Sequence, residues 1–338
     1  MLDFVRQYPL KYYARTLLRR RPPVLGTFLV QPDRLWCALP AGDELLFKDH
    51  LEKQPGALSL SAAPKNATSF FNTAFSDTER PEDAHWVVLV DTPGFAAEVI
   101  STAAKSNFQN LTQLKKLTDP RVLIDYLDPQ SAKRFVFEPL GLDLQPLTEE
   151  KLPKRFLYVG LDREVQGRIE AWFHATGQHL SAIVPMQVAA LAAAREVCPR
   201  PGLQIAATPC STTIGLFDKS GLVDCAFTMA LGEGVPYEDL VRGLQNMAME
   251  HTSELEAAGE ATDPTPFESF LFTAGLTATQ AEAHRTRLLE EGLSISILDS
   301  EEYADPPASV PRAKVQTFEA RLLSCFFTRT KGGRNHHD

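Results

Sequence analysis

The stretch from Leu203 to Gly234, LQIAATPCSTTIGLFDKSGLVDCAFTMALGEG, constrains the fold of this chain more than any other segment. A loop of small residues, Thr208 to Thr213, precedes an apolar strand. The turn Asp218-Lys219-Ser220-Gly221 then returns the chain into a second strand, because Asp, Ser and Gly favour tight turns. A Gly-x-Gly loop, with Gly232 and Gly234, follows the second strand. The pattern predicts a β-hairpin framed by two small-residue loops.

Strand patterns and amphipathic helix patterns alternate on both sides of this hairpin, which is typical of an α/β protein. Just upstream, a buried strand at 155–162 leads into a helix that ends at Gly177, a residue that favours helix termination. The other expected strands are 24–40 (two strands around the turn Gln31-Pro32-Asp33), 85–92, 121–128, 133–141, 179–186, 267–275 and 293–303. The other expected helices are 65–77, 95–117, 187–198, 237–259, 277–292 and 313–330, while 42–53 fits either a helix or a strand.

Length and charge limit the classes of protein to consider. A chain of 338 residues is long enough for more than one domain, since single cores rarely exceed roughly 250–300 residues. Its net charge of −9 argues against a general nucleic-acid binder, which usually presents a basic face. The first 23 residues mix aromatic and basic side chains, including Arg19-Arg20-Arg21. This segment fits either a membrane-surface contact or a helix packed on the body.

Cysteine spacing and hydropathy point to a cytoplasmic protein without a metal site. Five scattered cysteines, at 37, 198, 210, 225 and 325, have neither zinc-ligand nor redox spacing, so we expect buried free thiols. No run of about 18 apolar residues is present, so the sequence predicts no membrane span. We expect no nucleic-acid partner and no bound metal.

Three segments carry a family resemblance. They are FLYVGLDREVQGRIEAWFHATGQHLSAIVPMQVAALAAAREV (156–197), LQIAATPCSTTIGLFDKSGLVDCAFTMALGEGVPYEDLVRGL (203–244) and, more weakly, FLFTAGLTATQAEAHRTRLLEEGLSISILD (270–299). Their order resembles the actin-like ATPase (ribonuclease H-like) fold of actin, Hsp70 and sugar kinases. Within that fold they resemble the PilM family of type IV pilus assembly and the GspL cytoplasmic domains of type II secretion.

The resemblance implies an α/β architecture of two related halves, each with a mixed sheet flanked by helices. The expected divisions are an N-terminal basic and aromatic segment (1–23), a first half (24–155) with an inserted subdomain at about 91–155, a second half (156–330) and a disordered tail (331–338).

The residues that bind nucleotide in this fold are altered here. The resemblance places the metal-coordinating aspartate at Ala206 and a turn glycine at Thr208, and Pro209 removes a backbone donor. On the adenine side, the family's Gly-Gly-Gly-Ser becomes Thr273-Ala274-Gly275-Leu276. The sequence therefore predicts a pseudo-ATPase with no catalytic residue and no cofactor, ATP with magnesium being the disfavoured alternative.

The candidate cofactor-binding residues, should nucleotide binding survive, are Ser211, Thr212, Gly232, Gly234 and Gly275. Asp91-Thr92-Pro93-Gly94 spells a run seen in GTPases, but no Gly-rich Lys-Ser/Thr loop precedes it. We interpret it as a turn after a strand.

The resemblance implies a scaffold at the inner face of the inner membrane. Its partner would be a short cytoplasmic segment of a bitopic, PilN-like membrane protein, together with other platform proteins or an assembly ATPase. The docking region would lie within 91–155, where Arg121 to Leu140 looks like a sheet edge suited to strand addition.

Two other functions stay open on the sequence. The first is a sugar-kinase-like phosphotransferase that would use Asp162, Asp218 or Asp224, although Asp162 fits a helix cap and Asp218 a turn. The second is an adaptor in an unrelated system.

Overall fold

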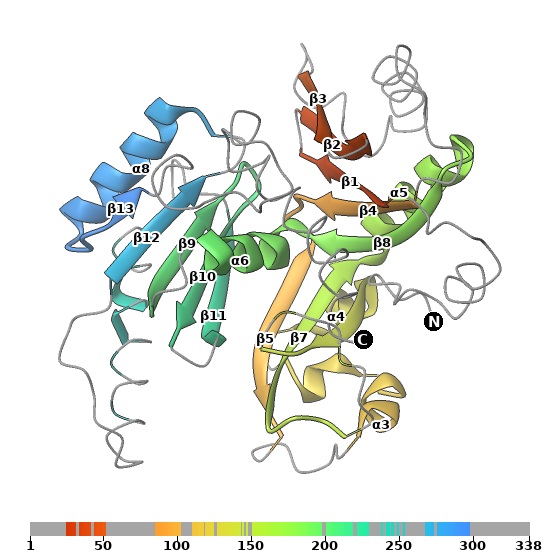
Figure 1. Cartoon of the computed structure of the whole chain (residues 1–338). Helices are drawn as coiled ribbons and strands as arrows, with labels where there is room; N and C mark the ends of the chain where they lie inside the picture. The colour runs from red at the N-terminus through yellow and green to blue at the C-terminus, as the bar shows by residue number, and fades with distance from the viewer. Residues whose placement is uncertain are drawn as a thin grey trace, which may run out of the picture.

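The computed structural model describes residues 25–31, 34–41, 44–51, 85–102, 110–117, 119–124, 127–142, 144, 147, 151–197, 201–218, 222–229, 268–273 and 276–297, and single positions between 238 and 253. These residues form three β-sheets with helices between and around them (Figure 1). The expected N-terminal segment, the helices at 65–77 and 313–330 and the C-terminal tail lie outside the described residues.

The first five-stranded sheet has the order β3-β2-β1-β4-β8. Its strands are β1 (Leu25–Val30), β2 (Arg34–Ala41), β3 (Glu44–Leu51), β4 (His85–Val90) and β8 (His179–Pro185). β1, β2 and β3 are antiparallel neighbours, whereas β4 is parallel to both β1 and β8. The continuous apolar run of β4 is buried from Trp86 to Val90, as expected of a strand covered on both faces.

The second five-stranded sheet repeats this arrangement, with the order β11-β10-β9-β12-β13. Its strands are β9 (Gly202–Ala207), β10 (Ser211–Phe217), β11 (Leu222–Met229), β12 (Glu268–Thr273) and β13 (Ser296–Ile297). Antiparallel pairs join β9, β10 and β11, and parallel pairs join β9, β12 and β13. The hairpin expected from the sequence is confirmed as β10 and β11.

A third, antiparallel sheet of order β5-β7-β6 is inserted between β4 and β8. It contains β5 (Phe95–Ser101), β6 (Phe135–Leu140) and β7 (Arg155–Asp162), with α3 (Leu111–Lys115), the 3-10 helix η1 (Pro120–Val122) and α4 (Pro129–Arg134) between them along the chain. One face of this sheet, including Phe156 and Tyr158, forms a small core of its own with Leu111 and Leu114 of α3 and with Leu123 beside η1.

Two expectations for this region are wrong. Residues 95–101 form a strand rather than part of a helix, because tertiary pairing with β7 outweighs the helix-favouring alanines. The described residues of 121–128 are a 3-10 turn and irregular backbone rather than a strand, since Asp119 caps η1 at Arg121 and Pro129 begins α4. The expected strand at 133–141 is confirmed as β6.

Helix α6 (Met186–Val197) lies between the two five-stranded sheets (Figure 1). Its side chains and those of both sheets belong to one hydrophobic core. Ala189, Ala190 and Ala194 are fully buried, so the small residues let both sheets approach the helix closely.

Helix α8 (Ala278–Glu290) covers the opposite face of the second sheet. A separate core lies between that face and the helix, and it includes Ile205, Leu271 and Leu288. The second sheet is therefore covered on both faces, by α6 on one and by α8 on the other.

Local signals predicted both long surface helices. Asp162 caps α5 (Arg163–Ala175) by accepting a hydrogen bond from the Glu164 amide at 2.8 Å. Gly177, with φ of 65°, follows the end of α5. Thr277 and Gln280 form a capping box at the start of α8.

The sheets divide the chain at a later point than residue 156. β7 pairs with β5 and β6, and β8 pairs with β4, so both strands belong to the sheets that precede them along the chain. We therefore use "first half" for residues 25–185 and "second half" for residues 202–297, with α6 between them.

Candidate functional site

The candidate site lies where strand ends from both halves meet the first turn of α6. Asp91 directly follows β4, and its amide donates to the Val30 carbonyl of β1 at 2.8 Å. Gln31 follows β1, and its Nε2 lies 3.9 Å from the sulfur of Met186 in α6. The short loop 208–210 joins β9 to β10 on the other side. In a sheet with parallel strands, such carboxyl-end loops are the usual place for a ligand site.

Thr208 connects the two halves at this point. Its Oγ1 lies 2.8 Å from Oδ1 of Asp91, and it accepts a hydrogen bond from the Ser211 amide at 3.0 Å. The Thr208 amide in turn donates to the Ser211 carbonyl at 2.9 Å. A hydroxyl has one hydrogen, and the carboxylate is its shortest acceptor, so we assign that hydrogen to Asp91.

Gln187 makes the second connection. Its Nε2 donates to the Thr92 carbonyl and to Oγ of Ser211, both at 2.8 Å, so the two amide hydrogens reach one half each. Oγ of Ser211 lies 3.3 Å from Oγ1 of Thr208. Along this series Gln187 donates to Ser211, Ser211 to Thr208, and Thr208 to Asp91. Hydrogen bonds that follow one another in this way polarise and strengthen each other.

All four side chains in this series are buried, at 1% exposure for Gln187, 2% for Thr208, 5% for Ser211 and 6% for Asp91. Burying polar groups is favourable only when they are hydrogen-bonded, which explains why these side chains bond to one another. Ala206, on β9, is 1% exposed and packs in the core shared with α6. Within the described ranges, no three His, Cys, Asp or Glu side chains group as metal ligands would.

Two of the five binding residues predicted from the sequence, Ser211 and Thr212, are among the described residues. Ser211 and Thr212 are the first residues of β10, not members of a loop, and both are buried. Thr212 lies opposite Ala207, and its hydroxyl has no hydrogen-bond partner among the described residues. The three candidate glycines lie outside the described residues; they are Gly232, Gly234 and Gly275. Leu276 is part-buried against the core under α8.

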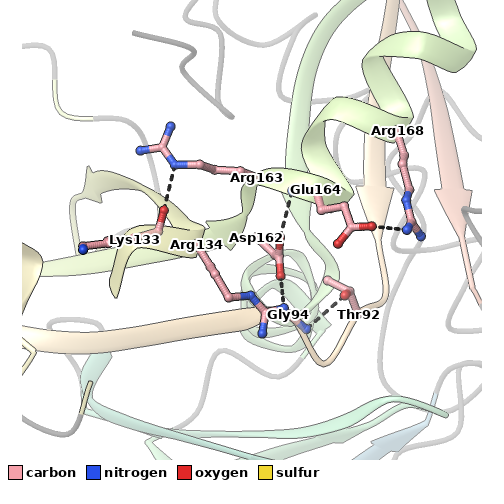
Figure 2. A network of polar contacts seen from close by, with 8 residues as sticks. All are labelled: Thr92, Gly94, Lys133, Arg134, Asp162, Arg163, Glu164 and Arg168. Carbon is pink, nitrogen blue, oxygen red and sulfur yellow. Dashed lines mark hydrogen bonds and ion pairs between the residues drawn. The ribbon is translucent and has the colours of Figure 1, made fainter. Parts of the chain in front are cut away.

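The run Asp91-Thr92-Pro93-Gly94 is a turn after a strand, as expected, but it also extends the polar contacts away from the site (Figure 2). Oγ1 of Thr92 accepts from the Gly94 amide at 3.0 Å, and the Gly94 carbonyl accepts from the Asp162 amide at 3.0 Å. Oδ2 of Asp162 forms an ion pair with Arg134, the last residue of α4. The contacts thus reach the surface of the inserted sheet.

The sequence interpretation missed Asp91, Gln187 and the bridging role of Thr208. A carboxylate directly after a fully buried strand needs a donor, and that signal alone could have marked Asp91 for attention. Its donor is 117 residues away along the chain, which no local pattern reveals.

The acids that a phosphotransferase would use lie elsewhere, and two of the cysteines, Cys210 and Cys225, are among the described residues. Cys210 and Cys225 are thiols rather than disulfides, as expected, although both are only part-buried. Loss of solvation raises the pKa of Cys225, so its thiol stays protonated. Asp224 accepts from the adjacent Cys225 amide at 2.8 Å, and Asp162 caps α5. Asp33 lies outside the described residues.

Comparisons with known proteins support the fold. No family model matches the sequence, and no curated protein matches it. A solved PilM–PilN type IV pilus biogenesis complex matches with a TM-score of 0.58 and 12% identity, over 90% of this chain and 98% of that one.

Two further structures match at lower similarity. The cytoplasmic domain of EpsL, an inner membrane component of the type II secretion system of Vibrio cholerae, has a TM-score of 0.45 at 13% identity, over 90% of this chain and 95% of that one. A protein of unknown function with an actin-like ATPase fold, from Bacteroides thetaiotaomicron, has a TM-score of 0.45 at 10% identity, over 88% of this chain and 94% of that one.

The chain therefore has the actin-like ATPase fold, as the sequence predicted. The two sheets of one topology agree with this assignment. Among the residues that the structure describes, no helix has the length and apolarity needed to cross a bilayer.

Proposed function

We propose that this chain is a scaffold protein of a type IV pilus or type II secretion platform, and that it has no ATPase activity. The likeness to the PilM–PilN complex supports this role, because it extends over nearly the whole of both chains. On this proposal the chain lies in the cytoplasm at the inner membrane. Its partner is a short cytoplasmic segment of a PilN-like bitopic membrane protein.

The pseudo-ATPase proposal rests on the backbone N–H groups of the loop between β9 and β10, which are not available to a phosphate. Phosphate loops bind anions through backbone N–H groups that point at the ligand. Here the Ser211 amide donates to Thr208 Oγ1 and the Thr208 amide to the Ser211 carbonyl, while Pro209 has no N–H. Three positions in and beside this loop therefore offer no donor to a phosphate.

The residues present also do not fit a magnesium ion. A hard divalent cation needs oxygen ligands or a carboxylate that orders its water shell. The buried methyl group of Ala206 supplies neither, and Oδ1 of Asp91 already accepts from Thr208 at 2.8 Å. This site therefore lacks the groups that would hold a metal-bound nucleotide.

The proposed docking region is the inserted sheet. β6 is a terminal strand in the order β5-β7-β6, so one of its edges has no strand beside it among those described. An extended peptide can add to such an edge through main-chain hydrogen bonds. Of the range 121–140 that the sequence suggested, only β6 itself has this character.

The alternative of a sugar-kinase-like phosphotransferase has no support from the candidate acids. A catalytic base must lie within reach of a substrate held at the site. The carboxylate of Asp162 is engaged by the α5 cap and the Arg134 ion pair. Asp224 pairs with Leu216 and Asp218 follows Phe217, so both lie at the end of β10 that is remote from the loop between β9 and β10.

The test is isothermal titration of the purified chain with Mg-ATP, beside a thermal-shift scan. We expect no binding heat and no rise in melting temperature. A ligand at about 100 times its Kd would stabilise the fold by about 2.7 kcal/mol, so binding would be visible in both assays. Micromolar binding by the unmodified chain would refute the predicted loss of nucleotide binding, and release of phosphate from the bound ATP would refute the absence of ATPase activity. The double variant Ala206→Asp, Thr208→Gly serves as the comparison, since it restores an acid and a glycine at the two altered positions.

A further inference from the structure

We propose that Asp91, Thr208, Ser211 and Gln187 form a lock, in which their hydrogen bonds hold the two halves of the chain together. The inference goes beyond the proposed function, because it concerns how the halves are joined and stands whichever partner the chain binds. It rests on buried hydrogen bonds between segments that are far apart in the sequence.

The first bond of the lock crosses directly from one half to the other. Thr208 follows β9 of the second half, and Asp91 follows β4 of the first half, with 2.8 Å between Oγ1 and Oδ1. A hydrogen bond to a carboxylate is about twice as strong as one between neutral groups. Both residues are buried, so water does not compete for either group.

The second connection passes through α6. Gln187 lies in the first turn of that helix and uses both hydrogens of Nε2, one on Thr92 of the first half and one on Ser211 of the second. A single amide group therefore connects the turn after β4 in the first half to the start of β10 in the second half. Opening the halves would break the Asp91–Thr208 bond together with at least one of the two bonds of Gln187.

The lock also borders the inserted sheet. Thr92 connects through Gly94 to Asp162, which pairs with Arg134 (Figure 2). A Cβ atom at Gly94 would lie 2.9 Å from Cβ of Asp162, so the crossover from β4 to β5 packs tightly against the end of β7. The start of β6, which directly follows Arg134, is therefore anchored on the first-half side of the lock.

The experiment compares Thr208→Val with Thr213→Val in the full chain, without nucleotide. The first variant keeps the side-chain volume and removes the hydroxyl that bonds Asp91. The second is a matched control, because Thr213 is fully buried in β10 and its hydroxyl has no partner among the described residues. Thr208→Ser keeps the hydroxyl and should restore the properties of the unmodified chain.

Hydrogen exchange measured by mass spectrometry is the main measurement, with small-angle X-ray scattering beside it. For Thr208→Val we expect exchange to rise about tenfold or more in both 88–94 and 205–212, since a buried group loses its partner. We also expect a larger radius of gyration. Thr213→Val should leave both segments and the radius unchanged. If Thr208→Val does not fold, Ser211→Ala removes one acceptor of Gln187 and should give the same pattern more weakly.

Two results would overturn the lock. Faster exchange confined to 205–212, with 88–94 and the radius unchanged, would make Thr208 a local turn residue. Equal effects of Thr208→Val and Thr213→Val would mean that the Thr208 hydroxyl does not hold the two halves together. Neither result bears on the pseudo-ATPase proposal, which is tested separately by Mg-ATP binding and hydrolysis in the unmodified chain.

Discussion

The two five-stranded sheets have the same strand order and the same mixture of antiparallel and parallel pairs, yet they are connected differently. In the first half, the chain between the last two strands contains the whole inserted sheet and α5. In the second half, the chain between β12 and β13 contains α8. The sheet is therefore the repeated unit of this fold, and the features specific to this chain lie in the connections.

The connections between the first two strands of each sheet are alike in one respect. Each consists of three residues, Gln31-Pro32-Asp33 in the first half and Thr208-Pro209-Cys210 in the second. Proline is the middle residue of both, and it has no backbone N–H group. At matching positions, both connections therefore lack a donor that a phosphate could use.

The halves differ in how their cores are shared. The first sheet, α6 and the α6 face of the second sheet form one continuous cluster. The other face of the second sheet has a separate core under α8. Substitutions in the shared cluster should therefore affect the whole molecule, and those under α8 should act on the second half alone.

The largest expected effect is that of Trp86→Ala in β4. Trp86 is fully buried, packs edge-on against Phe28 with ring centroids 6.1 Å apart, and lies against Gly26. Loss of a buried tryptophan costs about 3–5 kcal/mol of folding free energy. Urea unfolding followed by circular dichroism measures this loss. Trp86→Phe is the control, because it removes less side-chain volume and should cost less. Hydrogen exchange that rose only in the first half would show that the core is not shared.

Leu288→Ala in α8 should come next. Leu288 is fully buried in the separate core, and the substitution should cost about 2–5 kcal/mol. We expect the exchange of α8 and of β12 to rise while that of β4 stays unchanged. Leu289→Ala is the matched control, since this neighbouring side chain is 39% exposed and should contribute little. A uniform rise across both halves would contradict the division into two cores.

Sequence patterns predicted the sheets and the long helices well, because those elements depend on local signals. The apolar run of β4, the cap at Asp162 and the capping box at Thr277 can each be recognised within a few residues. The prediction for 95–101 was wrong because its alanines favour a helix locally and only the pairing with β7 makes it a strand.

The candidate site was less predictable than the fold. The resemblance identifies the altered positions Ala206 and Thr208, but the bonds made by Thr208 depend on Asp91 and Ser211. In the sequence, Gln187 is one residue of a helix rich in small side chains. Its role appears only once the fold brings Thr92 and Ser211 to its amide group.

The helix caps allow a finer comparison of the halves. Asp162 caps α5 in the first half and is 4% exposed, whereas Thr277 caps α8 on the exposed surface of the second. Replacing a cap by alanine costs about 0.5–2 kcal/mol. We expect the stability loss of Asp162→Ala to lie at the upper end of this range, because the substitution also leaves Arg134 without its ion pair. The loss for Thr277→Ala should lie at the lower end. Urea unfolding of the two variants checks the order, with Asp162→Asn retaining a cap. Equal losses would mean that the ion pair adds nothing.

The smallest expected effect concerns two exposed ion pairs, one in each half. Arg121 donates to Asp119 in the inserted region, with Nε 2.8 Å from Oδ1, and Arg285 donates to Glu282 in α8, with Nη2 2.6 Å from Oε1. Hydrogen bonds from these guanidinium groups lower the pKa of Asp119 and the pKa of Glu282 from their ordinary values.

A carboxylate whose pKa is lower in the folded state adds stability above its unfolded pKa, and this stability is lost as the pH falls through the folded pKa. Both pairs should therefore weaken only below about pH 4, and salt should reduce both effects. Nuclear magnetic resonance titration of the carboxyl carbons measures the two values. Arg121→Gln should raise the pKa of Asp119 and leave Glu282 unchanged, while Arg285→Gln should do the reverse. If either substitution moved both values, the two surfaces would be coupled, and the separation of the halves argued from their cores would not extend to their electrostatics.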